Sequence, residues 1–306
     1  MITDFEGKVA VVTGGARGIG AAMGKVFAER GMKVVLADVL AEPLDATVAE
    51  LRAAGLEVVG EVTDVTSLAS VEALRDATVS HYGAVHLVCN NAAVSSGATG
   101  MIWEYQMVDW RWAFDVNVLG VLHGINAFTQ LMIDQGEGHV VNTSSSNGGL
   151  ITGTGGSAIY PTTKSAVVTI TECLWANLKT VDAPVGASVL FPGTRTGGLL
   201  NTGIWQPGTN RPARYAKAND PNPDGFDTLP SYLEAMQKAG VEVKFANLEE
   251  IGETVLDGVA ENRFWITAHD PMSMRPKLEQ RLQSQLHSTD PIYLQDLRAG
   301  MSTRRS

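Results

Sequence analysis

The sequence predicts an α/β fold in which helices cover both faces of one doubly wound parallel sheet. The first observation is that short apolar, largely β-branched runs alternate with longer stretches of helical spacing. The second is that runs such as KVAVVT at 8–13 are apolar without alternation, as is typical of strands buried on both faces. Such a sheet is expected to bind its ligand beyond the carboxyl ends of its strands.

The expected elements follow one another in a regular order. Strands are predicted at 8–13, 33–38, 56–61, 85–89, 139–143, 185–191 and 264–267. Helices are predicted at 17–30, 43–54, 67–82, 109–134, 160–179 and 248–261. Gly31 and Gly55 end the first two helices, because glycine readily adopts the left-handed conformation that closes a helix. Ser67 is a suitable N-cap for the third.

Residues 193–245 interrupt this alternation and hold five of the twelve prolines. So long a segment without regular structure usually has a function, often as a lid. We expect one domain over 1–270 that includes a loop at 194–246, and a C-terminal extension over 271–306. In that extension Leu278, Leu282 and Leu286 keep helical spacing.

The composition excludes several classes of protein. The chain of 306 residues is 44% apolar and carries a net charge of −10, which argues against nucleic-acid binding and against docking on anionic membranes. Cys89 and Cys173 are too few for a disulfide framework or a cysteine metal site, and we expect both as buried free thiols and no bound metal. No basic leader followed by an apolar stretch and no long apolar run is seen, so a cytoplasmic location is expected.

A glycine-rich segment, TGGARGIG at 13–20, leads from the first strand into the first helix. Glycines without β-carbons let the backbone approach a pyrophosphate, and the helix N-terminus offers unpaired N–H groups. Asp38 ends the second strand, where a carboxylate can accept hydrogen bonds from both ribose hydroxyls and repel a 2′-phosphate. Arg17 argues the other way, since a cation there could meet that phosphate unless it pairs elsewhere on the surface. We weigh Asp38 more heavily and expect NAD.

Further signatures follow in a fixed order, namely Asp64-Val65, Asn90-Asn91-Ala92-Ala93, Asn117, Ser145, Tyr160-Pro161-Thr162-Thr163-Lys164 and Pro192-Gly193. Together with the glycine-rich segment they resemble the short-chain dehydrogenases/reductases, NAD(P)-dependent oxidoreductases with a Rossmann fold. The resemblance covers roughly residues 5–193, with a fainter match at 248–268.

The proton-transfer chemistry can be argued from the residues themselves. Tyr160 and Lys164 are one helical turn apart, and an ammonium beside a phenol is expected to lower its pKa from about 10. Tyr160 could then take a proton from an alcohol or return one to a ketone, while Ser145 hydrogen-bonds the same oxygen. Ser146 is the alternative candidate for this role of Ser145. The separation of 15 residues from Ser145 to Tyr160 is longer than usual, and we assign the extra length to 148–156.

The resemblance adds roles that the spacing alone does not give. It implies that Lys164 also binds the nicotinamide ribose and that Asn117 holds a water in a proton relay. It implies cofactor contacts by Gly14, Arg17, Gly18, Ile19, Gly20, Asp38, Asp64, Val65, Asn90, Ala92, Tyr160, Lys164, Pro192, Gly193 and Thr196. Ala93 stands where the family usually has glycine, and Thr196 is the best candidate for a carboxamide contact. Arg195 could meet a polar substrate group or face solvent.

The expected reaction is hydride transfer between NAD(H) and a bulky, largely apolar secondary alcohol or ketone. The loop supplies apolar residues that either line a substrate pocket or pack on the protein body, namely Leu199, Leu200, Ile204, Trp205, Tyr215, Phe226 and Tyr232. Residues 101–107 are another candidate wall. Alternatives are an NADP-dependent carbonyl reductase and a non-catalytic dinucleotide-binding regulator. The helices at 109–134 and 160–179 are apolar over a wide face, and the resemblance implies that they pair in a homodimer or homotetramer.

Overall fold

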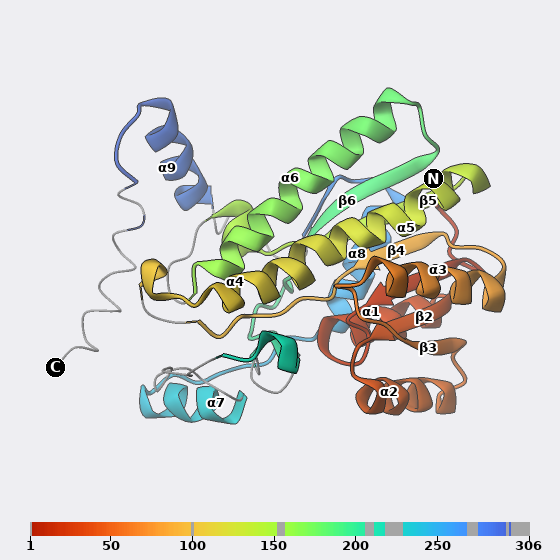
Figure 1. Ribbon diagram of the computed structural model, residues 1–306, viewed down its shortest axis with the longest axis horizontal. Coiled ribbons are helices and arrows are strands. Elements are labelled where there is room, and N and C mark those ends of the chain that lie inside the picture. Colours follow the sequence, from red (N-terminus) through yellow and green to blue (C-terminus); the bar gives the residue numbers. More distant parts are fainter. Residues whose placement is uncertain are drawn as a thin grey trace.

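The computed structural model describes residues 2–98, 101–151, 157–205, 211–217, 229–267, 275–291 and 294, apart from the side chains of Trp205 and Tyr232. The described strands form one parallel sheet in the order β3-β2-β1-β4-β5-β6-β7 (Figure 1). Their bounds are β1 Val9–Thr13, β2 Lys33–Asp38, β3 Val58–Val62, β4 Leu87–Asn90, β5 Gly138–Thr143, β6 Val185–Phe191 and β7 Trp265–Thr267. The predicted doubly wound Rossmann-type sheet is confirmed.

Helices cover the two faces of the sheet. One layer contains α1 Gly18–Glu29, α2 Ala41–Ala53 and α8 Glu249–Ala260, and the other contains α3 Leu68–Tyr82, α4 Met107–Phe114, α5 Gly120–Gln135 and α6 Ile159–Thr180. Successive residues of β1 serve opposite layers, since Val12 packs with Phe27 of α1 whereas Val11 packs with Phe128 of α5. This is why the strands read as unbroken apolar runs.

The helix expected at 109–134 is interrupted. The π-helical turn Asp115–Leu119 separates α4 from α5 and contains Asn117. A π-turn adds one residue without breaking the helix axis, so apolar spacing does not reveal it. By length and composition alone, the whole span Met107–Gln135 could cross a membrane. Here it lies along the sheet, and Phe128 and Met132 of its inner face belong to the core.

The segment 193–245 contains more regular structure than the sequence indicates. Its described parts include the short 3-10 turns Gly203–Trp205 and Ala213–Tyr215, and the helix α7 Leu229–Lys238. Pro230 is the second residue of α7, where its missing N–H costs no helical hydrogen bond. The expectation of an irregular segment is therefore wrong for α7. Phe226 and most of the glycine-rich stretch at 148–156 lie outside the described residues.

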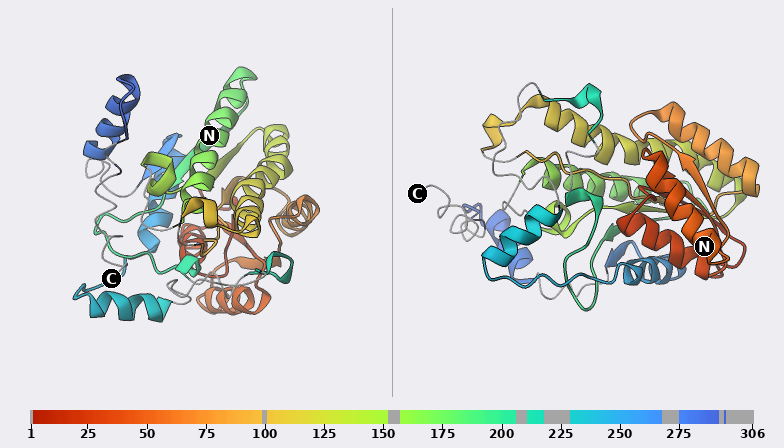
Figure 2. Two further views of the ribbon diagram at one scale, coloured as in Figure 1. Left: turned by 60° about the vertical axis from the view of Figure 1, so that its left-hand side comes forward. Right: turned by 90° about the horizontal axis from the view of Figure 1, so that it is seen from below.

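The C-terminal extension forms α9 Arg275–Leu286, which has no buried residue and lies away from the sheet (Figure 2). The Arg281 guanidinium donates to the Leu150 carbonyl at 3.2 Å, while Leu282 and Leu286 are exposed. One expectation about the thiols is wrong as well. Cys89 is buried, but Cys173 is exposed, because it lies on the face of α6 that points away from the sheet.

Candidate active site

A cleft of about 630 Å³ lies at the carboxyl ends of the strands, where the fold class predicts a ligand site. Polar groups from the loop after β1 and from β2, β5 and α6 meet apolar groups from α4 and the loop after β6. The predicted site residues that line the cleft are Gly14, Arg17, Ile19, Gly20, Asp38, Asp64, Val65, Ala92, Ser145, Tyr160, Lys164 and Pro192.

The glycine-rich loop forms a cradle at one end of this cleft. A β-carbon on Gly20 would lie 2.1 Å from the Gly14 carbonyl oxygen, and one on Gly14 would lie 2.9 Å from the Ala92 Cα. Only glycine therefore allows these backbones to approach one another. Among the residues that the structure describes, no side chain caps the N-terminus of α1, so its first N–H groups can bind an acceptor. This arrangement fits the pyrophosphate of a dinucleotide.

Asp38 is fixed at the edge of the same cleft. Its Oδ2 accepts from the Ala16 N–H and its Oδ1 from the Leu40 N–H, both at 3.1 Å. Arg17 also lines the cleft, and a β-carbon on Gly203 would lie 3.1 Å from its Nε. Asp38, which favours NAD, and Arg17, which could bind a 2′-phosphate, thus line the same cleft.

The structure brings Tyr160, Ser145 and Lys164 together. Tyr160 and Lys164 are on consecutive turns of α6, with Lys164 Nζ 5.7 Å from the Tyr160 ring centroid and donating to the Thr143 carbonyl at 2.8 Å. Ser145, just beyond β5, hydrogen-bonds Tyr160 and accepts from the Asn147 N–H at 3.2 Å. Ser144 instead points inward and donates to the Lys164 carbonyl at 2.7 Å. Of the three serines, Ser145 is the one beside Tyr160.

The expectation that Lys164 lowers the pKa of Tyr160 is wrong in this structure. Burial raises the pKa of Tyr160 to about 12, and the hydrogen bond with Ser145 opposes that rise. Burial also lowers the pKa of Lys164 to about 7, so a substantial share of this amine is neutral at neutral pH. A neutral amine cannot stabilise a phenolate by its charge. Of the two neighbours Lys164 and Ser145, it is Ser145 whose hydrogen bond favours the ionised form of Tyr160.

Asn117 does not line the cleft, but its side chain holds Val94, which does. Its Oδ1 accepts from the Val94 N–H at 2.8 Å, and its Nδ2 donates to the Val94 carbonyl and to Thr163 Oγ1, both at 3.0 Å. Both polar atoms of the amide are therefore engaged in holding the loop after β4 against α6. A π-turn surrounds Asn117, and such turns loosen the regular main-chain hydrogen bonding of a helix.

Four predicted cofactor contacts, Gly18 among them, are not among the residues that line the cleft. The Asn90 side chain is buried and donates to Asn142 Oδ1 at 2.8 Å, so it faces the sheet interior. Gly193 is outside the lining. Thr196 is exposed, with its hydroxyl 3.5 Å from Glu250 Oε1. Arg195 is exposed too, and its backbone N–H donates to Glu250 at 3.0 Å, which favours the solvent-facing interpretation.

The sequence patterns do not identify some of the residues that line the cleft. Thr202 lies against the glycine-rich loop, since a β-carbon on Gly18 would be 3.3 Å from its Cα, and this makes Thr202 a better candidate than Thr196 for a cofactor contact. No fixed spacing from Pro192 signals it, because the intervening loop sets its position. Trp112 and Val116 form an apolar wall that helical spacing alone assigns to the core.

Comparison with known proteins agrees with this geometry. Residues 8–200 match the sequence profile of the family described as "short chain dehydrogenase". A "C alpha-dehydrogenase" of Sphingobium sp. is 30% identical over 94% of this chain and 88% of its own. A short chain dehydrogenase/reductase of Burkholderia phymatum in complex with NAD superposes with a TM-score of 0.83 at 36% identity, covering 95% of this chain and 98% of its own. A metagenomic short-chain oxidoreductase in complex with NADP has a TM-score of 0.57 at 28% identity, over 62% and 84%.

Proposed function

Because the chain belongs to the short-chain dehydrogenase/reductase family, we propose that it oxidises a bulky, largely apolar secondary alcohol with NAD, or reduces the corresponding ketone with NADH. The observation that carries this proposal is the joint position of Tyr160, Ser145 and Lys164 in a cleft that begins at the glycine-rich cradle. The family consists of oxidoreductases that use NAD or NADP and act on small molecules.

Each side chain has a defined part in this proposal. When bound, NAD+ would supply the hydride acceptor. As the phenolate, Tyr160 accepts the proton of the alcohol during oxidation, and as the neutral phenol it donates a proton to the carbonyl oxygen during reduction. Ser145 hydrogen-bonds the same substrate oxygen and holds it in line. Lys164, anchored on the Thr143 carbonyl, binds the nicotinamide ribose. A water relay through Asn117 would use its main-chain carbonyl, since its amide is committed to Val94 and Thr163.

The substrate class follows from the remaining walls of the cleft. Apolar side chains make up much of the rest of the lining, and they come from Val94, Trp112, Val116, Leu199, Leu200, Ile204 and Tyr215. Such a lining favours a large hydrocarbon or aromatic body, with the reacting hydroxyl as its main polar group. Asp38 supports NAD. Arg17 favours the second candidate, an NADP-dependent carbonyl reductase.

A panel of secondary alcohols tests the proposed reaction. We expect NAD reduction, followed by nicotinamide absorbance, with bulky aryl or alicyclic alcohols and little with short aliphatic ones, because only the former fill the apolar cleft. Activity confined to short alcohols would contradict the substrate class. Absence of turnover with either cofactor, despite cofactor binding, would favour a regulator.

We also propose that the protein is a homodimer or a homotetramer. The combined α4–α5 helix and α6 run alongside one another on one layer, and their outward faces expose Leu119 and Trp175 (Figure 1). Apolar side chains on two adjacent helices suit a two-fold interface. Light scattering at micromolar concentration is expected to give at least twice the mass of 32.5 kDa. A fully active monomer would contradict this assignment.

A further inference from the structure

Residues 211–217, here called the strap, lie across the cleft between α4 and the loop that follows β3. Pro212, Arg214 and Tyr215 of the strap line the cleft itself. The strap comes from the loop after β6, far along the chain from both of its neighbours. What holds it there decides how the cleft opens.

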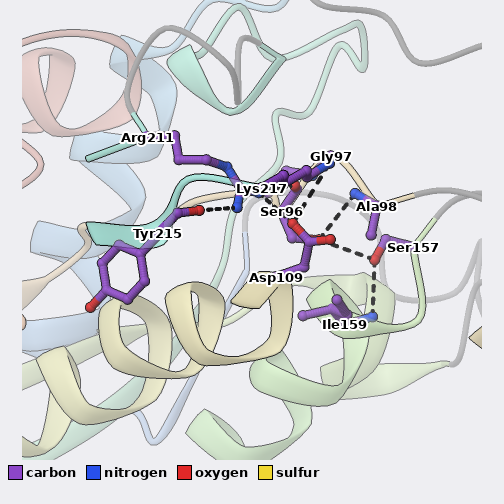
Figure 3. Close-up of polar contacts among 10 residues, drawn as sticks. Ser96, Gly97, Ala98, Asp109, Ser157, Ile159, Arg211, Tyr215 and Lys217 are labelled. Atoms are coloured by element: carbon purple, nitrogen blue, oxygen red, sulfur yellow. Dashed lines mark hydrogen bonds and ion pairs between the residues drawn. The ribbon is translucent and has the colours of Figure 1, made fainter. Parts of the chain in front are cut away.

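Both ends of the strap are anchored on one buried charge. Asp109 of α4 is only 2% exposed, and its Oδ1 lies 2.5 Å from an Arg211 nitrogen and 3.7 Å from Lys217 Nζ. Figure 3 shows Arg211 and Lys217 gathered at Asp109, beside Ser96. Arg211 also lies 4.4 Å from the Trp112 ring centroid and donates to the Ser96 carbonyl at 2.6 Å. A carboxylate this buried needs such partners, so both ends of the strap are firmly held.

The middle of the strap makes a more exposed contact through Arg214. A single Arg214 nitrogen donates to Asp64 Oδ2 and to Thr66 Oγ1, both at 2.7 Å. Asp64 and Thr66 belong to the loop after β3 and line the cleft, whereas the Arg214 side chain is half exposed. Burial would raise the pKa of Asp64, but hydrogen bonds from Arg214 and Thr66 outweigh burial and hold the pKa below its usual value. The Asp64 carboxylate is therefore ionised at neutral pH.

We propose that Arg214 is a cofactor-retaining residue, whose bridge to Asp64 and Thr66 closes the cleft over the adenosine end of a bound dinucleotide. This inference rests on the proposed use of NAD. The adenosine end is the one bounded by Asp38 and Asp64, because a carboxylate at the end of β2 can accept the hydroxyls of the adenosine ribose and Asp64 follows the neighbouring strand β3. The dinucleotide leaves once the Arg214 bridge opens, while the Arg211 anchor stays in place. Arg214 thus governs cofactor release and takes no part in proton transfer at Tyr160.

Release of NADH from the full-length protein tests this inference without any substrate. Stopped-flow displacement of NADH, followed by its fluorescence, gives the dissociation rate constant for the wild type and for Arg214→Gln. We expect release to be about three- to tenfold faster in Arg214→Gln, in keeping with loss of one half-exposed ion pair and a hydroxyl contact. Arg214→Lys keeps the charge and is expected to fall between the two.

Two controls separate retention from a general effect on the fold. Arg195→Gln removes an exposed arginine from the same loop, outside the cleft, and is expected to release NADH at the wild-type rate. Added salt screens exposed ion pairs, so it is expected to speed release from the wild type more than from Arg214→Gln. A merely structural role for Arg214 would not produce this difference in salt dependence.

Several outcomes would overturn the inference. Equal release from the wild type and Arg214→Gln would show that the bridge does not retain the cofactor. Slower release from the variant would show that Arg214 competes with the cofactor for Asp64. If the wild type bound neither NADH nor NADPH, the proposed function and this inference would fail together. If only NADPH bound, the same measurement with NADPH would decide the role of Arg214.

Discussion

Replacing Tyr160 with phenylalanine is expected to lower turnover by about 10²-fold or more, with NADH binding retained. The phenyl ring preserves the packing of the cleft but removes the hydroxyl that hydrogen-bonds Ser145. Initial rates of alcohol oxidation and a fluorescence titration with NADH measure the two effects separately. Near-normal turnover in Tyr160→Phe would remove Tyr160 from the mechanism.

A companion variant, Ser145→Ala, reports on the ionisation of Tyr160. Burial raises the pKa of Tyr160 to about 12, so the rate of oxidation is expected to increase with pH from neutral into the alkaline range. The hydrogen bond with Ser145 lowers this pKa, and its removal therefore shifts the rising limb to higher pH. A limb at the same pH in both proteins would mean that Ser145 does not act through Tyr160.

Changing Asp38 to serine is expected to shift the ratio of NAD to NADP affinity by about 100-fold toward NADP. The carboxylate is held at the cleft edge by the Ala16 and Leu40 N–H groups, where it can accept ribose hydroxyls and repel a 2′-phosphate. Serine removes the charge and most of the acceptor capacity, and leaves Arg17 in the cleft. Titration of both reduced cofactors against wild type and variant measures the shift.

The matched control for Asp38→Ser is Asp45→Ser, which removes an exposed carboxylate of α2 that does not line the cleft. It is expected to leave the preference unchanged, since exposed charges at a distance are screened. A wild type that prefers NADP would mean that Arg17 outweighs Asp38. Arg17→Ser would then be the variant that loses the preference.

Local patterns account for the part of the site that the sequence predicts. The cradle at 13–20, Asp38 and the pair Tyr160 and Lys164 each depend on neighbours close in sequence, so strand and helix periodicity is enough to place them. Their electrostatics could not be predicted in the same way. The pKa of Tyr160 depends on burial by distant segments, and the i,i+4 spacing to Lys164 carries no information about it.

The residues that the sequence misses depend on contacts between distant segments. Thr202 reaches the glycine-rich loop only because of the path of the loop after β6. Asp109 reads as an ordinary polar residue of a helix, and its role as an anchor appears once Arg211 and Lys217 are folded against it. Periodicity reports how a residue relates to its own helix or strand, and both of these roles are set by partners about one hundred or more residues away.

The π-turn at Asp115–Leu119 puts the two halves of one long helix out of phase. One extra residue corresponds to roughly 100° of rotation about the helix axis. With that rotation, α4 turns Trp112 toward the cleft while α5 turns Phe128 into the core. Deleting a single residue from the turn would restore a uniform α-helix and rotate one of these faces away from its neighbours. This helix should therefore accept substitutions far more readily than any change in its length.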